Sequence, residues 1–260
     1  MRARNMVGRK KYDRGLVKSD ETLFSIIEYV RAHGPIGVTD VANHLDLSKS
    51  SVHKHLKTLE KEGWVTNSDG EYKLSFKFLT IGGEMRDEHH LCSLAHPLLR
   101  ELANETDQVV LLSLFEQNQG VFVQRYNERY GIGKAVYEGR RYNLHHTASG
   151  KAMLAELSEE QTRQIIDEYD FEPRTGNTIT TREELAEELG RVREQGYAMN
   201  LEEGNEGIHA IGVAIPDSTT PAAVCVGGPA SRLPEERLRN EFAEILLNKV
   251  NEIQLRLRYQ

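Results

Sequence analysis

The chain has 260 residues, 38% hydrophobic and 28% charged, which is the composition of a globular protein with one large or two ordinary domains. Its net charge of −7 argues against a protein that coats nucleic acid over its whole surface. No apolar run has the length of about 20 residues that a membrane helix needs. The basic start MRARNMVGRKKYDRG lacks the apolar region of a secretion signal, and two cysteines offer no disulfide framework. We therefore expect a cytoplasmic protein.

Charge is distributed unevenly along the chain. Residues 1–75 hold 13 Lys and Arg against 10 Asp and Glu, whereas residues 76–260 hold 20 against 30. A mildly basic front joined to an acidic back fits a DNA-reading module attached to a domain that avoids DNA. Chance variation between two domains would give the same totals, so charge alone does not decide.

Residues 1–18 combine many basic side chains with few apolar ones (Arg2, Arg4, Arg9, Lys10, Lys11, Arg14 and Lys18). This composition predicts a flexible basic arm. Such an arm can lie along DNA phosphates or in a minor groove; a merely solvated tail is an equal alternative.

Residues 19–80 predict a winged helix-turn-helix. Apolar residues at helical spacing mark a first helix over 20–33, which Gly34-Pro35 ends. A short second helix begins at Val38, a turn follows at 46–48, and a third helix runs to Gly63. Ser48 is placed to cap the third helix. The runs 64–66 and 71–74 then predict a two-stranded ribbon, because Asp-Gly between them is a strong hairpin signal.

The outward face of the third predicted helix is rich in hydrogen-bond donors: Lys49, Ser50, Ser51, His53, Lys54 and Lys57. A polar helix face after a tight turn suits a DNA major groove. We predict that the two serines, His53 and Lys54 face base edges, and that Lys49 and Lys57 hold phosphates. Thr39, at the start of the second helix, and Asn67, in the wing, complete the predicted DNA-binding set.

Residues 81–105 are predicted as a linker helix between two domains. Gly82-Gly83 interrupts its pattern, and Pro97 marks a kink or a new first turn. An apolar seam continues past this proline and is a candidate dimer seam (Leu91, Leu94, Leu98 and Leu102).

Residues 106–260 alternate β-rich runs with helical segments, which predicts an α+β domain. Strands are expected at Val109–Phe115, Val121–Tyr126, near Ala135–Tyr137, in the approach to Leu144, and at Ile208–Ile215 and Ala222–Val226. Helices are expected at 150–156, 158–169 and 181–195 and at the C-terminus. Two of these open with capping boxes, Ser158-x-x-Gln161 and Thr181-x-x-Glu184.

The segment 144–155, LHHTASGKAMLA, passes from a strand through small residues into a helix. Unpaired N–H groups at a helix start bind anions, so a carboxylate can dock on the amides near Ala148, Ser149 and Gly150. A close-packed turn without a ligand is an equal alternative. A phosphate loop is excluded, because its pattern needs Gly where His145 stands and Ser or Thr where Ala152 stands. No Gly-x-Ser-x-Gly nucleophile elbow is present either.

His89, Cys92 and His96 fall on one side of a helix at i, i+3 and i+7, and zinc uses such ligands. The pattern lacks a clear fourth ligand, and a cysteine on an apolar helix face usually fills a core. A coincidence of spacing is the commoner explanation, and no metal or cofactor is predicted.

Taken together, the front and back motifs resemble the IclR family of bacterial and archaeal transcription regulators. The front match is VTDVANHLDLSKSSVHKHLKTLEKEGWV followed by the wing. The back matches are HHTASGKAMLAEL, TREELAEELGRVREQGYAMNLEEGNEGIHAIGVAIPD and AAVCVGGPASRL. The resemblance covers about Asp20 to Leu257. It implies a GAF-like α/β effector-binding domain over 106–260 and dimers or tetramers on palindromic operators. It also implies a small organic acid whose binding changes the spacing of the DNA-binding heads.

In the family, the ligand carboxylate meets amides that match Ala148 and Ser149, and later strands complete the pocket. The effector-binding set predicted for this chain comprises His145, Thr147, Ala148, Ser149, Gly150, Asn200, Ala210, Cys225 and Gly227. Its wall is less polar than in characterised relatives, which allows an acid bulkier than a two- or three-carbon keto acid, such as a sugar-derived or aromatic acid. Glu202 and Glu203 match the family's acidic pair and are expected to hold loop structure.

The leading hypothesis is a one-component transcription regulator that binds double-stranded operator DNA and has no catalytic residues. One alternative is an enzyme acting on a small acid, with His145 or His146 as base and Ser149 as nucleophile. It lacks an orienting acid at a recognisable spacing. A third hypothesis is a winged helix used for protein contact, with the back domain as a dimeriser.

Overall fold

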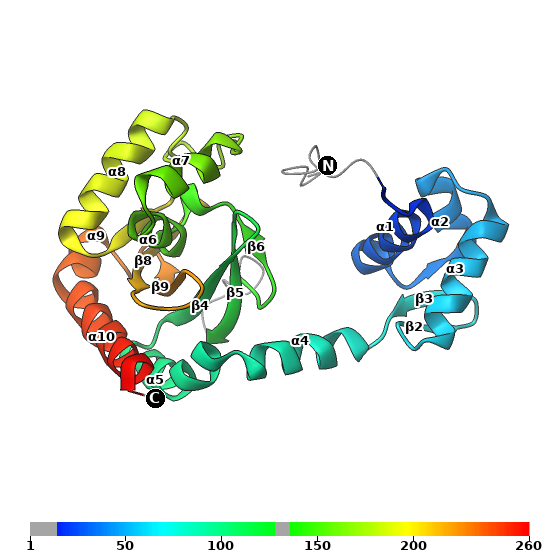
Figure 1. Ribbon diagram of the computed structural model, residues 1–260, viewed down its shortest axis with the longest axis horizontal. Coiled ribbons are helices and arrows are strands. Elements are labelled where there is room, and N and C mark those ends of the chain that lie inside the picture. Colours follow the sequence, from blue (N-terminus) through cyan, green and yellow to red (C-terminus); the bar gives the residue numbers. More distant parts are fainter. Residues whose placement is uncertain (1–14, 128–135, 260) are drawn as a thin grey trace. The chain divides into compact units, whose positions relative to one another are not determined.

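The computed structural model describes residues 15–127 and 136–259, and the chain divides into two compact units between Asp87 and Glu88 (Figure 1). Most of the predicted basic arm lies outside the described residues. Within the described ranges, no helix has the length and apolar character needed to cross a membrane.

The first unit is a winged helix-turn-helix. Its helices are α1 (Lys18–His33), α2 (Val38–Leu45) and α3 (Lys49–Lys61), and they enclose a small apolar core. Its strands form an antiparallel sheet in the order β1-β3-β2, with β1 at Ile36–Gly37, β2 at Val65–Ser68 and β3 at Glu71–Leu74. The three predicted helices and the ribbon are confirmed. The two-residue strand β1 was not predicted.

Short-range chemistry sets the turns of this unit. Ser48 Oγ accepts a hydrogen bond from the Ser51 amide at 3.2 Å and caps α3, as predicted. At the tip of the β2–β3 ribbon, Asp69 and Gly70 have φ values of 54° and 87°, the positive values that a type I′ turn requires. The Gly70 amide donates to Asn67 Oδ1 at 3.1 Å, so the wing tip is closed by a side chain.

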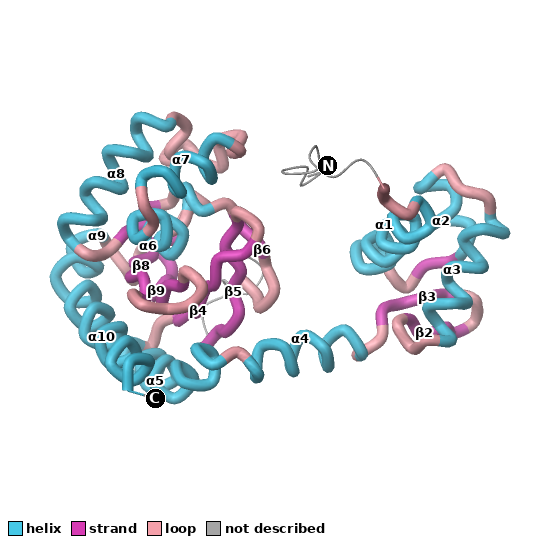
Figure 2. Tube along the Cα trace, viewed as in Figure 1, coloured by secondary structure: helices cyan, strands magenta, loops and turns pink. Residues whose placement is uncertain are grey.

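The second unit is a six-stranded antiparallel sheet in the order β6-β5-β4-β9-β8-β7 (Figures 1 and 2). The strands are β4 (Val109–Glu116), β5 (Gln119–Tyr126), β6 (Arg141–Tyr142), β7 (Ala198–Leu201), β8 (Ile208–Ile215) and β9 (Ala222–Pro229). The helices are α5 (His90–Thr106), α6 (Ala148–Glu156), α7 (Glu159–Asp167), α8 (Arg182–Gln195), α9 (Glu235–Arg237) and α10 (Ala243–Tyr259). Two short turns of helix, η3 (Leu144–His146) and η4 (Leu238–Phe242), complete it. The two predicted capping boxes are both formed.

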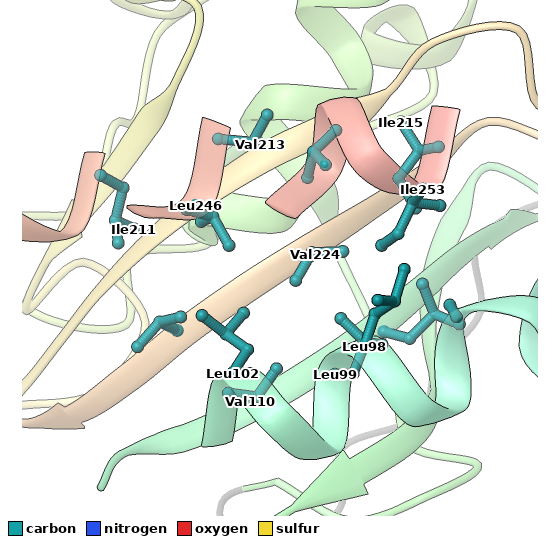
Figure 3. Packing of buried hydrophobic residues seen from close by; sticks show 14 of the residues in the cluster. Leu98, Leu99, Leu102, Val110, Ile211, Val213, Ile215, Val224, Leu246 and Ile253 are labelled. Atoms are coloured by element: carbon teal, nitrogen blue, oxygen red, sulfur yellow. The ribbon is translucent and has the colours of Figure 1, made fainter. Parts of the chain in front are cut away.

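Each face of this sheet has its own apolar core, because successive strand side chains point to opposite faces. One face packs against α5 and α10; Figure 3 shows Leu98, Leu102 and Leu246 meeting Val110 and Val224 there. The other face packs against α6, α7 and α8 through Val109, Leu111 and Ala223 and their neighbours. Cys225 lies on this second face, beneath the start of α6.

The predicted linker helix over 81–105 is two helices. α4 (Lys77–Glu88) runs through Gly82-Gly83 without interruption, and α5 begins at His90. The predicted dimer seam is wrong, because Leu91, Leu94, Leu98 and Leu102 are all buried against the unit's own sheet. Four exposed large apolar side chains (Phe76, Leu79, Ile81 and Met85) lie instead at and around α4, which buries none of its residues.

Two strand assignments also differ. Val136 and Tyr137 lie outside any strand, and Ala135 is outside the described residues. The four-residue edge strand β7 was missed because helical patterning before it and loop-like polar residues after it hid a short run.

Candidate functional sites

The face of α3 predicted to meet DNA is open to solvent. Lys49, Ser50, His53 and Lys54 are exposed and Ser51 is half-buried, while Val52, Leu56 and Leu59 on the opposite stripe are buried. The buried apolar stripe thus holds α3 against the core while its hydrogen-bond donors face solvent. This arrangement fits insertion into a major groove.

Three of the predicted DNA-contacting residues differ from the rest. Lys57 and Asn67 already bond other groups of the protein, and Thr39 and Asn67 do not lie on α3. Lys57 Nζ pairs with Glu60 Oε2 at 2.9 Å, so its charge is shared with an acid. The oxygen of Asn67 is engaged by the wing turn, which leaves its amide nitrogen for a phosphate. Thr39 is exposed in the first turn of α2.

The start of α6 lies tightly against the sheet. A Cβ at Gly212 of β8 would lie 2.7 Å from the Ala148 carbonyl carbon and 2.8 Å from the Ser149 nitrogen. A Cβ at Gly150 would lie 2.2 Å from the Leu144 oxygen. Glycine at position 212 therefore lets the helix start lie directly on β8, and glycine at position 150 lets it lie against the turn at Leu144.

The amides of this first turn are not equally available. Thr147 is the N-cap, and its Oγ1 accepts from the Gly150 amide at 3.1 Å. The Ser149 amide is directed at the Cys225 thiol. Among the described residues, the buried Ala148 amide has no acceptor. One free N–H at the positive end of a helix is a site for a carboxylate oxygen.

A cavity of about 60 Å³ opens at this helix start. This is several times the roughly 10–15 Å³ that one buried water needs. It is lined by Val109, Leu111, Phe122, Val136, Arg140, Tyr142, His146, Thr147, Ala148, Ser149, Asn200, Gly204, Asn205, Ile208, Ala210, Cys225 and Gly227. Its wall is mainly apolar, with polar groups at a few points, as is usual for small-molecule sites.

The two neighbouring histidines are buried and uncharged. His145 is 0% and His146 is 5% exposed, and all four ring nitrogens lack hydrogen-bond partners among the described residues. Burial lowers the pKa of His145 to about 4 and of His146 to about 3. Only His146 lines the cavity. His145 turns away and contacts the rings of Tyr169 and Phe171.

The cavity's hydroxyl groups bond each other rather than a base. Ser149 Oγ and Tyr142 Oη lie 2.8 Å apart, and burial raises the pKa of Tyr142 above its usual range. Burial also raises the pKa of the Cys225 thiol to about 12, so the thiol stays neutral. Since neither imidazole bonds Ser149, the Ser–His pair required by the enzyme hypothesis is not formed.

A buried lysine ties α6 to the loop beside the cavity. Lys151, 1% exposed, contacts Glu203 Oε1 at 2.7 Å and Glu188 Oε1 at 2.9 Å. Asn200 Oδ1 accepts from the Glu203 amide at 2.8 Å. The loop that follows β7, which brings Gly204 to the cavity, is therefore held by a charge on α6.

Family models match both units. The model described as bacterial transcriptional regulator IclR C-terminal matches residues 84–255, and the IclR helix-turn-helix domain matches residues 23–69. The chain belongs to the IclR family. It is a transcriptional regulator with a helix-turn-helix domain and an α/β effector-binding domain.

Individual relatives agree with this assignment. The HTH-type transcriptional regulator KdgR of Escherichia coli K12 is 29% identical over 248 residues, which cover 94% of each chain. The crystal structure of the Thermotoga maritima IclR is similar with a TM-score of 0.78 and 28% identity, covering 92% of this chain and 98% of that one. An IclR homologue from Microbacterium hydrocarbonoxydans, crystallised with 4-hydroxybenzoate, has the same fold (TM-score 0.78, 18% identity, 93% and 100% coverage).

Seven of the nine effector-binding residues predicted for this IclR-family chain line the cavity: Thr147, Ala148, Ser149, Asn200, Ala210, Cys225 and Gly227. His145 does not line the cavity, because its ring contacts Tyr169 and Phe171 instead. Gly150 does not line it either, and its amide donates to the N-cap side chain of Thr147. The missed residues include Arg140 and His146. His146 stood in the sequence beside the residue chosen, whereas nothing local to Arg140 marks it as a cavity residue.

The candidate metal ligands are not assembled. Cys92 on α5 is buried in the core, and His96 Nδ1 is bonded to Tyr126 Oη at 2.9 Å. In the described ranges, no group of three or more His, Cys, Asp or Glu is placed to hold a metal ion.

Proposed function

We propose that this regulator binds operator DNA as a homodimer or homotetramer and changes its DNA affinity when a small organic acid enters the α6 cavity. The observation that carries the proposal is the Ala148 amide, which lies at a helix start on the wall of a mainly apolar cavity. Neither this amide nor the His146 ring beside it has a hydrogen-bond partner among the described residues. A buried donor without an acceptor is unfavourable, and a bound carboxylate satisfies it.

DNA reading is proposed for the exposed face of α3. Ser50, Ser51, His53 and Lys54 face base edges, and Lys49, Lys57 and the wing hold phosphates. Thr39 and Asn67 add contacts at the edges of this surface. Serine and histidine give weak base discrimination singly, so specificity requires two heads on a two-part operator.

Pairing of two chains is proposed through the α4 region. Phe76, Leu79, Ile81 and Met85 are 85%, 70%, 43% and 69% exposed. Large apolar side chains gathered within ten residues mark a contact surface. A second copy of this chain is the occupant because a reader of palindromic DNA needs two identical heads side by side.

The switch is a linkage between the cavity and the heads. A ligand shifts DNA affinity only as far as it binds the two states differently, typically by about 1–3 kcal/mol. The relative crystallised with 4-hydroxybenzoate supports a small acid as the class of effector. We propose that the chain acts by binding, without turnover of the acid; among the described residues, Ser149 bonds Tyr142 and neither imidazole.

The test couples DNA and acid binding on the full chain. DNA sites are selected from a random pool, and their Kd values are measured with and without short keto acids, sugar acids and aromatic acids. We expect at least one acid to change the operator Kd by fivefold or more, and the acid to be recovered unchanged. Ala210→Leu, which fills the cavity, should abolish this response and leave DNA binding intact. A parent protein whose operator Kd no acid changes would contradict the switch.

A further inference from the structure

Arg140 is a cation on the wall of the effector cavity that belongs to no predicted site. Its backbone is fixed against β5, because Arg140 O accepts from the Phe122 amide at 3.1 Å and its own amide donates to Tyr137 O at 3.1 Å. The side chain is half-buried and lines the cavity. Its position is therefore set by the sheet.

The guanidinium of Arg140 has no carboxylate partner among the described residues. Burial is the main influence that lowers its pKa; Tyr137 acts in the opposite direction, and Arg174, a cation like Arg140, lowers the pKa further. The neighbouring Arg141, by contrast, pairs with Glu116. A half-buried arginine without a counter-ion is unfavourable, and an anionic ligand group would offset that cost.

His146 stands on the same cavity wall with both ring nitrogens unpartnered. A Cβ at Gly204 would lie 3.2 Å from His146 Nδ1, so glycine keeps the space beside that nitrogen free. A neutral imidazole offers one donor and one acceptor. Burial lowers the pKa of His146 most, and His145, Arg174 and Arg140 lower it further; among the described residues no acid acts on it.

We propose that Arg140 and His146 form a second anchor in the effector cavity, and that the effector is a dicarboxylate with one carboxylate at the Ala148 amide and the other on Arg140. The inference rests on the proposed function and specifies its ligand. A planar guanidinium grips a carboxylate through two parallel bonds, which a hydroxyl group cannot match. Apolar side chains such as Leu111, Phe122 and Ile208 line the same cavity, so the body of the ligand is hydrocarbon. A cavity of about 60 Å³ suits a small ligand.

The test compares acids of equal length on the full chain by isothermal titration calorimetry. The pairs are malonate with propionate, succinate with butyrate, and glutarate with valerate. We expect one dicarboxylate to bind at least tenfold more tightly than its monocarboxylate partner. Arg140→Gln should abolish this ratio without weakening the monocarboxylate, and Arg140→Lys should restore part of it. Arg141→Gln is the matched control, because that arginine is paired and does not line the cavity.

His146→Phe tests the second member of the anchor and should reduce the same ratio by severalfold, while the melting temperature shows whether the variant folds. Equal binding within every pair, or equal loss of both acids in Arg140→Gln, would overturn the second anchor and leave the carboxylate site at Ala148 standing. If no acid of either kind binds the parent, both the anchor and the proposed effector site are wrong.

Discussion

The two units of this regulator keep their functional polar groups in opposite environments. On α3 the donors are exposed, and the one charged group there that has a partner, Lys57, is exposed as well. Around the effector cavity most polar groups are buried or half-buried, and several lack partners among the described residues. The first unit folds around an apolar core that excludes its functional residues. The second unit folds with its functional residues inside.

This difference separates binding from stability in one unit and couples them in the other. An exposed polar side chain is nearly as well solvated in the folded state as in the unfolded state, so its replacement changes stability little. A buried charge or imidazole loses water on folding, and its contribution depends on its partners. A ligand that supplies the missing partners therefore stabilises the second unit.

The largest effect is expected from Lys151→Met. This change leaves the buried Glu203 without its cation, whereas Glu188 keeps Arg191, and removing one member of a buried ion pair costs about 3–5 kcal/mol. Urea denaturation measures the free energy of unfolding. The matched control is Lys57→Met, which breaks an exposed lysine–glutamate pair and should leave the unfolding midpoint almost unchanged. Equal losses in the two variants would erase the contrast between the units.

An intermediate effect is expected from pH. The pKa values of His145 and His146 are lowered to about 4 and about 3 in the folded state, whereas an unfolded histidine titrates near 6.5. Between these values the unfolded chain binds protons that the folded chain excludes, so stability falls as pH falls below 6.5. From pH 7.5 to pH 5 each imidazole should contribute a loss of about 2 kcal/mol.

Thermal unfolding followed over this pH range tests the assignment. His145→Phe should flatten the dependence by about half, while replacing the exposed His53 by Gln should leave it unchanged. A folded chain that takes up protons at these histidines near pH 6 would show that they are solvated and not buried as described.

Local sequence predicted the fold well wherever a pattern repeats over several residues. The helices of the first unit, the capping boxes at Ser158 and Thr181, and the long strands β4, β5, β8 and β9 were all found this way. The short strands β1 and β7 were missed, because two or four residues carry too little periodicity and depend on partners distant in sequence. The linker failed for another reason: α4 and α5 have similar helical sequences, and only the sheet beneath α5 distinguishes them.

Cavity residues that are consecutive in the sequence were predicted, whereas cavity residues brought there by strand pairing were missed. Thr147, Ala148 and Ser149 are consecutive, so a helix start revealed them. The segment was expected to approach Leu144 as a strand, whereas Leu144–His146 is a 3-10 turn in which His146 lines the cavity and His145 contacts Tyr169 and Phe171. Arg140 enters the cavity only because β6 pairs with β5, a contact that no local pattern encodes.

The smallest effects on folding, and the clearest on function, are expected on α3. Lys54→Ala should leave stability unchanged and relax operator preference, because one good base contact is worth about 1–3 kcal/mol of discrimination.

Lys57→Ala should weaken binding to operator and random DNA alike and lower the slope of log Kd against log salt by about one. Since Lys57 shares its charge with Glu60, Glu60→Gln should strengthen binding to all sequences. Competition binding at several salt concentrations measures all three variants. If Lys54→Ala and Lys57→Ala both bind operator and random DNA as the parent does, α3 is not the recognition helix. The exposed polar face of the first unit would then not be its functional surface, and the contrast with the buried site of the second unit would not hold.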